Sequence, residues 1–140
     1  MLDWREYGSA YAAEMIATSR TLAEALTRND IPVFSTKRGM TDSHQFAFIA
    51  TKGGQATAKR LRAAGILASG IGLPLPDVDG DMNGLRLGTP EAVRWGVTHT
   101  DAPELAELIA DALSAEDPAS VAPRTAEMRK RFDQLHFIRS

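Results

Sequence analysis

The chain has 140 residues, of which 44% are hydrophobic and 24% charged, with a formal net charge of −2 and no cysteine. This length suits one domain with a modest core, and the near-neutral charge gives no electrostatic sign of nucleic-acid binding. The lack of cysteine excludes disulfides and thiolate metal sites and fits a cytoplasmic chain. No apolar run approaches the ~20 residues that cross a bilayer, so a membrane is not expected as a partner. Nucleic acid is not expected either, because of the near-neutral charge.

The N-terminal part of the chain predicts a long helix followed by two strands. Residues 8–28 show helical periodicity. A short strand is expected at 31–35, where Pro32 favours the edge of a sheet. Residues 45–50 (QFAFIA) are apolar on both faces and therefore predict a central strand. The apolar stripe of the helix consists of Tyr11, Met15, Leu22 and Leu26.

A second helix is expected at 55–64, and Gly65 ends it as a C-terminal cap. A strand at 66–69 and a long loop at 70–84 follow. The loop contains an alternating acidic run, PDVDGD, which resembles the start of a calcium-binding loop. The glycine and glutamate that an EF-hand requires at later positions are absent, so a solvated acidic turn is expected instead. The aspartates of this run are Asp77, Asp79 and Asp81.

The segment at 84–89 (GLRLGT) places one arginine between two glycines. Leu85 and Leu87 alternate with Arg86, so a strand here would turn both leucines into the core and the arginine to the opposite face. The flanking glycines allow a ligand or another backbone to approach closely. A guanidinium in this setting suits bidentate binding of a carboxylate, although spacing alone favours a surface ion pair.

Three more helices complete the predicted fold. Thr89 is expected to cap a short helix at 90–95, in which Pro90 is the first residue. Longer helices are expected at 101–114 and 124–137. Strands interspersed with helices on short links predict an α/β (α+β) domain, in which a small sheet is packed with helices. The inward residues of the last helix are expected to be Met128, Phe132 and Leu135.

The histidines of the chain do not suggest a metal site. His44, His99 and His136 are widely separated, and no nucleophile–histidine–acid set can be assembled from the spacing. His44 precedes the strand expected at 45–50, where a structural role is favoured and a supporting role in a binding site is the alternative. No metal ligand is assigned.

Several segments resemble serine hydroxymethyltransferases, which are pyridoxal-phosphate (PLP) enzymes of fold type I. Residues 84–90 (GLRLGTP) are similar to the family segment G-[IL]-R-[ILV]-G-T-P. Residues 11–26 resemble the helix that leads into the family's small C-terminal domain. Three further matches follow in the family's order. They are residues 41–44 (TDSH), residues 64–66 (AGI) followed by Leu73-Pro74, and, more loosely, residues 132–135 (FDQL) in the tail.

The resemblance implies a fold and a function. It implies a small, mostly antiparallel sheet packed with helices, as in the C-terminal domain of fold type I PLP enzymes. Residues 1–30 would form a helix linking to a large domain, and residues 31–140 the small domain. Arg86 would bind the α-carboxylate of an amino-acid substrate, in Cα–Cβ bond cleavage or formation on β-hydroxy amino acids.

The family's large domain, with its PLP lysine, has no counterpart in the sequence. The four lysines lie in contexts unlike the family's lysine segment, so no catalytic residue is expected in this chain. We expect a fragment or one subunit of a split enzyme, inactive alone and oligomeric with a large-domain polypeptide. PLP would be held mainly by that partner. The lysines are Lys37, Lys52, Lys59 and Lys130.

Two departures from the family pattern bear on the site. Trp95 stands where the family has an arginine before Gly96, so Arg94 is a candidate for a supporting charge. Residues 69–74 (SGIGLP) replace the family's N-K-N-x-I-P loop, whose asparagine helps to bind tetrahydrofolate. This departure counts against folate and favours aldehyde exchange of the threonine transaldolase type. A non-catalytic binding or regulatory subunit remains the alternative.

Overall fold

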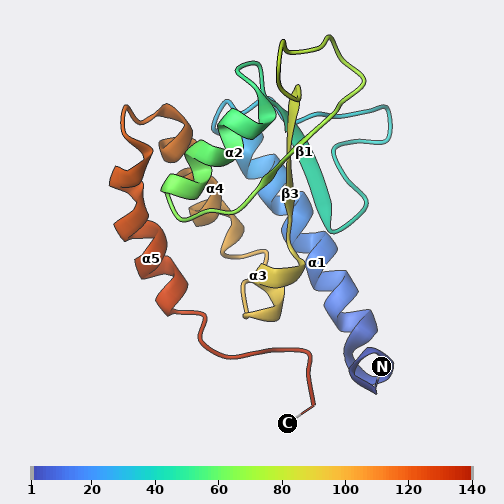
Figure 1. Cartoon of the computed structure of the whole chain (residues 1–140). Coiled ribbons are helices and arrows are strands. Elements are labelled where there is room, and N and C mark those ends of the chain that lie inside the picture. The colour runs from blue at the N-terminus through green and yellow to red at the C-terminus, as the bar shows by residue number, and fades with distance from the viewer. Residues whose placement is uncertain (1, 140) are drawn as a thin grey trace.

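A long N-terminal helix runs the length of the molecule in the computed structural model, which describes residues 2–139 (Figure 1). This helix, α1, spans Leu2–Arg28 and begins earlier than the predicted residue 8. Its end at residues 29–30 is marked by a positive φ of 61° at Asp30. The predicted apolar stripe is buried and consists of Tyr11, Met15, Leu22 and Leu26.

A three-stranded sheet with the order β1-β3-β2 lies beside this helix. β1 (Gln45–Ile49) and β2 (Ser69–Ile71) both pair with β3 (Gly84–Gly88), and both pairings are antiparallel. β3 is therefore the central strand, and its side chains alternate between a core face and an outer face. The predicted fold, a small antiparallel sheet packed with helices, is confirmed.

The helices of the chain cover one face of this sheet (Figure 1). α2 (Gly54–Ala63) contacts β2 and β3, while α4 (Ala102–Ser114) contacts both α1 and α2. The short α3 (Pro90–Arg94) follows β3 directly and packs on α1. The chain then continues through a 3₁₀ turn, η1 (Pro118–Val121), into α5 (Ala122–Lys130).

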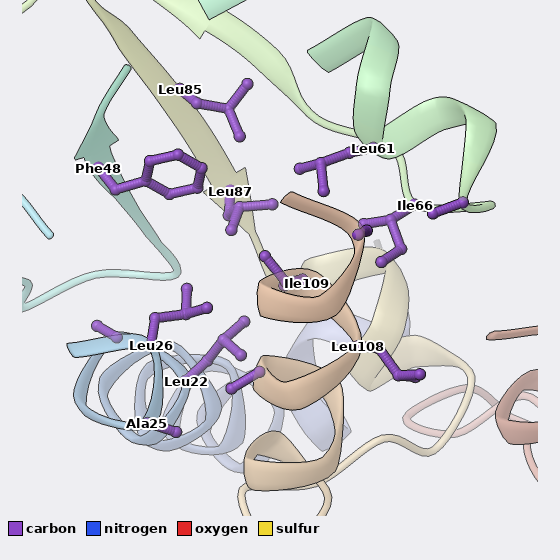
Figure 2. Packing of buried hydrophobic residues seen from close by; sticks show 14 of the residues in the cluster. Leu22, Ala25, Leu26, Phe48, Leu61, Ile66, Leu85, Leu87, Leu108 and Ile109 are labelled. Carbon is purple, nitrogen blue, oxygen red and sulfur yellow. The ribbon is translucent and has the colours of Figure 1, made fainter. Parts of the chain in front are cut away.

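The hydrophobic core lies between the sheet and these helices (Figure 2). Leu85 and Leu87 of β3 point toward Ile109 of α4, and Leu22 and Leu26 of α1 approach from below in that view. Leu85 and Leu26 are fully buried. Burial of this kind contributes roughly 1.5–3 kcal/mol for each large aliphatic side chain, so the core fixes β3 and the face that it presents outward.

Three strand predictions are corrected by the structure. Residues 45–50 do form a strand, but β1 lies at the edge of the sheet because β3 pairs with it on one side only. Its apolar outer side is partly covered by residues 31–35, which add a single bridge between Val33 and Phe48 rather than a full strand. The strand expected at 66–69 begins only at Ser69, because residue pairing with β3 starts there.

The last helix ends earlier than predicted. α5 stops at Lys130, and Leu135 is exposed rather than inward, whereas Met128 is buried as expected. The tail leaves the helix because tertiary contacts hold it elsewhere: the backbone N–H of His136 donates to the carbonyl of Arg94. Both ends of the chain consequently lie at the same end of the molecule (Figure 1).

The long α1 does not have the character of a membrane span. Within residues 2–139, no helix combines the length and the apolar composition that crossing a bilayer requires.

Candidate functional site

Arg86 stands at the middle of the outer face of the sheet. On β3, Leu85 and Leu87 are buried and Arg86 between them is exposed, which confirms the predicted alternation. The register places Arg86 between Ala47 of β1 and Ser69 of β2. Directly paired residues point to the same face of a sheet, so the guanidinium lies between two small side chains that carry no charge.

No counter-ion for Arg86 is found within residues 2–139. Its side chain forms neither an ion pair nor a hydrogen bond with any other described residue. Four other arginines do form ion pairs with described residues, namely Arg20, Arg124, Arg131 and Arg139. The ion pair that spacing alone favours for Arg86 therefore has no partner in this part of the chain, and the guanidinium keeps its donors available.

The two glycines beside Arg86 are in different surroundings. A Cβ on Gly84 would lie 2.6 Å from Leu73 Cδ1, so the space over Gly84 is filled by the loop that follows β2. A Cβ on Gly88 would meet only Pro90 Cδ at 3.7 Å and the carbonyl of His44 at 3.8 Å. A Cβ on Gly88 would thus make only ordinary van der Waals contacts, and both Gly88 and Arg86 line a shallow depression.

This depression has a volume of about 440 Å³ and lies at the end of β3 that leads into α3. Its walls come from three places in the sequence: the entry to β1, the entry to β2 and the end of β3. The lining contains one arginine and no acidic side chain, which is suited to binding one carboxylate of a small ligand. The lining residues are His44, Gln45, Leu67, Ala68, Ser69, Arg86, Gly88 and Pro90.

Asn83 organises the loop on the other side of Arg86. Its side chain is buried, and Oδ1 accepts a hydrogen bond from the Leu73 N–H at 2.7 Å. Nδ2 donates to the carbonyl oxygens of Leu73, Leu75 and Pro76 at 3.0, 2.9 and 3.2 Å. Asn83 thereby holds Leu73 over Gly84. A lone asparagine before a strand carries no distinctive sequence signal, so this role of Asn83 is evident only in the structure.

Thr89 anchors the end of β3 to α1. The prediction that it caps α3 is correct for its position but wrong for its side chain, which makes no capping hydrogen bond. The buried hydroxyl instead donates toward the carbonyl oxygens of Met15 and His44, at 2.8 and 3.1 Å. The hydroxyl therefore donates to distant carbonyl oxygens and does not accept from the N–H groups of the first turn of α3, so the strand that carries Arg86 is fastened directly to α1.

The candidate supporting residues lie in different places. His44 is exposed and lines the depression with Arg86, while its carbonyl accepts hydrogen bonds from Thr89. Arg94 lies at the junction of α1 and the tail, with its guanidinium carbon 4.8 Å from the centre of the Tyr11 ring. The structure therefore brings His44 to the Arg86 depression and places Arg94 in another cluster.

The acidic run holds the start of α2. Asp81 accepts hydrogen bonds from the backbone N–H groups of Gln55 and Ala56, at 2.9 and 3.0 Å. These bonds, with a smaller contribution from the Met82 N–H, lower the pKa of Asp81 below its ordinary value. In the described part of the chain, no cluster of three or more His, Cys, Asp or Glu side chains is arranged to hold a metal.

Comparison with known proteins gives relatives over nearly the whole chain, although no family model matches it. It is 56% identical over 142 residues to an alpha-methylserine aldolase from Ralstonia sp, and 52% identical over 140 residues to one from Variovorax paradoxus. It is 34% identical to serine hydroxymethyltransferase from Methanopyrus kandleri. These matches cover 98–99% of this chain but only 32–33% of the relatives. The chain thus spans about a third of their length.

A solved structure of a related enzyme has the same fold over nearly the whole of this chain. The L-threonine transaldolase from Pseudomonas fluorescens superposes with a TM-score of 0.82 and 26% identity, over 96% of this chain and 31% of that one. The fold is therefore one found in fold type I PLP enzymes. More narrowly, the chain is homologous to alpha-methylserine aldolases and serine hydroxymethyltransferases, and its extent is consistent with their C-terminal domain.

Proposed function

We propose that this chain is the small C-terminal domain of a PLP-dependent enzyme that breaks or forms the Cα–Cβ bond of β-hydroxy amino acids. Arg86 would bind the α-carboxylate of the substrate. The observation that carries the proposal is the exposed guanidinium at the centre of the sheet, without a counter-ion within residues 2–139. Sequence identity of 50–56% to proteins named alpha-methylserine aldolase supports this class of reaction.

The residues of this chain fit the substrate better than they fit the cofactor. The lining of the Arg86 depression includes no lysine, and the four lysines of the chain lie in other segments. The group that holds PLP would therefore belong to a large domain outside this chain. When bound there, PLP supplies an electron sink for the pair of electrons left on Cα.

Arg86 would act by positioning. The planar guanidinium can donate two parallel hydrogen bonds to a carboxylate, which fixes the orientation of the substrate as well as its location. Fixing the carboxylate restricts rotation about the bond to Cα and so determines which bond of Cα is presented for cleavage. In the retro-aldol direction, the β-hydroxyl loses its proton, Cβ and its oxygen leave together as an aldehyde, and the electron pair of the broken Cα–Cβ bond remains on Cα.

The substrate class follows from the relatives and from one loop. The alpha-methylserine aldolases act, by their name, on a serine that carries a methyl group on Cα. In this chain Ser69 and Ile71 lie in β2, in the segment that stands in place of the family's folate-binding loop, and neither side chain offers an amide. We therefore favour direct release or exchange of an aldehyde over transfer to tetrahydrofolate.

The large domain would join this chain through α1. Residues 1–30 would form the link and residues 31–140 the small domain, with His44 and Arg94 as supporting residues. The large domain belongs either to the same polypeptide or to a separate subunit, and we expect no turnover without it. A regulatory subunit with the same fold is the rival, and Arg86 distinguishes the two: a regulatory subunit would not need its charge.

The test is steady-state kinetics of the enzyme that contains this domain together with its large domain. Arg86→Ala should raise KM and lower kcat, because loss of a bidentate charged pair costs roughly 2–4 kcal/mol, or about 30- to 800-fold in kcat/KM. Arg86→Lys should recover only part, since an ammonium group lacks the planar fork. Arg62→Ala, at an exposed position on α2, is the matched control.

The substrates for this test are α-methylserine, with release of formaldehyde as the readout, L-threonine with an acceptor aldehyde, and L-serine with tetrahydrofolate. Strong folate-dependent turnover would overturn the preference for direct aldehyde release. Turnover that is unchanged by Arg86→Ala with all three substrates would overturn the site assignment and favour the regulatory subunit.

A further inference from the structure

The corner where β3 passes into α3 is attached to α1 at two points. The Thr89 hydroxyl donates to the carbonyl of Met15 at 2.8 Å. The Tyr11 hydroxyl donates to the carbonyl of Pro90, also at 2.8 Å. Tyr11 and Met15 lie one turn apart on the helix, which is a separation of about 6 Å along its axis. Two attachments at this separation prevent the corner from pivoting about either one, so they also fix the direction of the strand that carries Arg86.

The C-terminal tail, residues 136–139, covers the Tyr11 attachment. The Phe137 ring stacks on the Tyr11 ring, with 5.2 Å between the centroids and 24° between the planes. The guanidinium carbon of Arg94, the last residue of α3, lies 4.8 Å from the centre of the same Tyr11 ring. Tyr11 is buried in a small second core, against which Phe137 packs. The Tyr11 ring is therefore held by the tail and by α3 at once.

The tail is held at both of its ends in a strained conformation. At Phe137 the backbone φ is 59°, in the left-handed region that is unfavourable for residues other than glycine. On one side of this residue, the N–H of His136 donates to the last carbonyl of α3 at 2.8 Å. On the other side, Arg139 donates from its backbone N–H to Asp3 at 3.0 Å and from Nε to Glu6 at 2.7 Å. Such a conformation persists only where the surrounding contacts hold it, and here those contacts join the end of α3 to the first turns of α1 (Figure 1).

We propose that Phe137 is a positioning residue, which acts through Tyr11 on the location of the Arg86 guanidinium. This inference rests on the proposed function, because it takes Arg86 as the carboxylate site and α1 as the link to the large domain. PLP would be held by that domain and the substrate carboxylate by Arg86, so the reaction requires a fixed relation between α1 and β3. By stacking on Tyr11, Phe137 keeps α1 and the end of β3 in that relation.

Removing the Phe137 ring should lower the catalytic efficiency of the complete enzyme. Misplacement of a positioning group by about 1 Å can cost about 100-fold in rate. Because both hydrogen bonds at the corner remain in Phe137→Ala, we expect a smaller loss of about tenfold in kcat/KM, with KM raised and kcat lowered. Phe137→Tyr should recover most of this loss, because a phenol ring can stack in the same way. Leu135→Ala is the matched control, since Leu135 lies close to the tail in sequence, is exposed and stands outside the second core.

A double-mutant cycle tests whether Phe137 acts through Arg86. kcat/KM is measured for the wild type, Phe137→Ala, Arg86→Ala and the double variant, with whichever of the three substrates named above the wild-type enzyme turns over fastest. We expect Phe137→Ala to cost about tenfold when Arg86 is present and less than about twofold in the Arg86→Ala background, since the guanidinium to be positioned is then missing. Phe137→Leu, which keeps an apolar side chain but has no ring to stack, is carried through the same cycle and decides the question if Phe137→Ala does not fold.

Two results would overturn the positioning role of Phe137. One is the same fold-loss with and without Arg86, which is what a residue that only stabilises the domain would give. The other is an unchanged kcat/KM in Phe137→Leu while Arg86 is present. Arg86→Ala alone tests the carboxylate site separately: wild-type turnover in that variant would overturn the proposed function itself. Melting temperatures report stability independently, and a lowered value together with a loss that depends on Arg86 still supports the positioning role.

Discussion

The hydroxyl of Thr89 donates a hydrogen bond to the carbonyl oxygen of Met15 at a distance of 2.8 Å, and both residues are buried. This bond joins the end of β3 to the middle of α1, residues that are 74 positions apart in the sequence. A second bond from α1, from the Tyr11 hydroxyl to the carbonyl of Pro90 at 2.8 Å, lies close by. The strand that carries Arg86 is therefore positioned by the helix proposed to lead to the large domain.

Removing the Thr89 hydroxyl should weaken this junction. Thr89→Val keeps the shape of the side chain but removes the hydroxyl donor, while the His44 carbonyl keeps its bond from the Thr89 N–H, so the expected loss is about 0.5–1.5 kcal/mol. Urea unfolding, followed by circular dichroism, would measure the loss. Thr51→Val, at an exposed position in the turn after β1, should change stability by less than about 0.5 kcal/mol. Equal stability of Thr89→Val and the wild type would contradict the anchoring role.

Asn83→Ala should release the loop that covers Gly84. The substitution removes the acceptor of the Leu73 N–H and the donors to three carbonyl oxygens. We expect a loss of about 1–3 kcal/mol and faster hydrogen exchange of the Leu73 amide. Asn29→Ala, which removes one side-chain hydrogen bond at the end of α1, is the control and should leave that amide protected. Unchanged exchange at Leu73 in Asn83→Ala would contradict this role.

Arg86→Ala should not destabilise the fold. The side chain is exposed and makes no ion pair or hydrogen bond within residues 2–139, so the change should lie within about 0.5 kcal/mol. The same urea unfolding experiment measures it. A clearly larger loss would show that the guanidinium stabilises the domain, and the ion-pair interpretation would then be preferred over carboxylate binding.

The link between Asp81 and α2 should depend on pH. The Gln55 and Ala56 N–H groups, followed by that of Met82, lower the folded-state pKa of Asp81 below the ordinary value of 3.8. The carboxylate therefore contributes stability above pH 3.8, and this contribution is lost as the pH falls through the lowered pKa. The difference in melting temperature between wild type and Asp81→Asn should be constant near neutral pH and shrink in acid. A difference that grows in acid would contradict this.

Local patterns in the sequence were sufficient to predict the face of the sheet on which Arg86 lies. Alternation along a strand has a period of two, so Leu85 and Leu87 in the core require Arg86 outside it, whatever the strand pairs with. The helical stripe from Tyr11 to Leu26 is predictable for the same reason, because a period near 3.6 residues defines one face of α1. The α+β class follows from such local information, whereas the carboxylate-binding hypothesis at Arg86 depends on the resemblance of residues 84–90 to serine hydroxymethyltransferases.

Tertiary structure decided what surrounds that face. The strand order made β3 central, which no property of β3 alone could indicate, and long-range acceptors took the Thr89 hydroxyl away from its local capping role. The two glycines that flank Arg86 are equivalent in sequence, yet a Cβ on Gly84 would clash with Leu73, whereas a Cβ on Gly88 would make only ordinary van der Waals contacts. The space over a glycine depends on residues distant in the chain, and their packing is set by the whole core rather than by any local pattern.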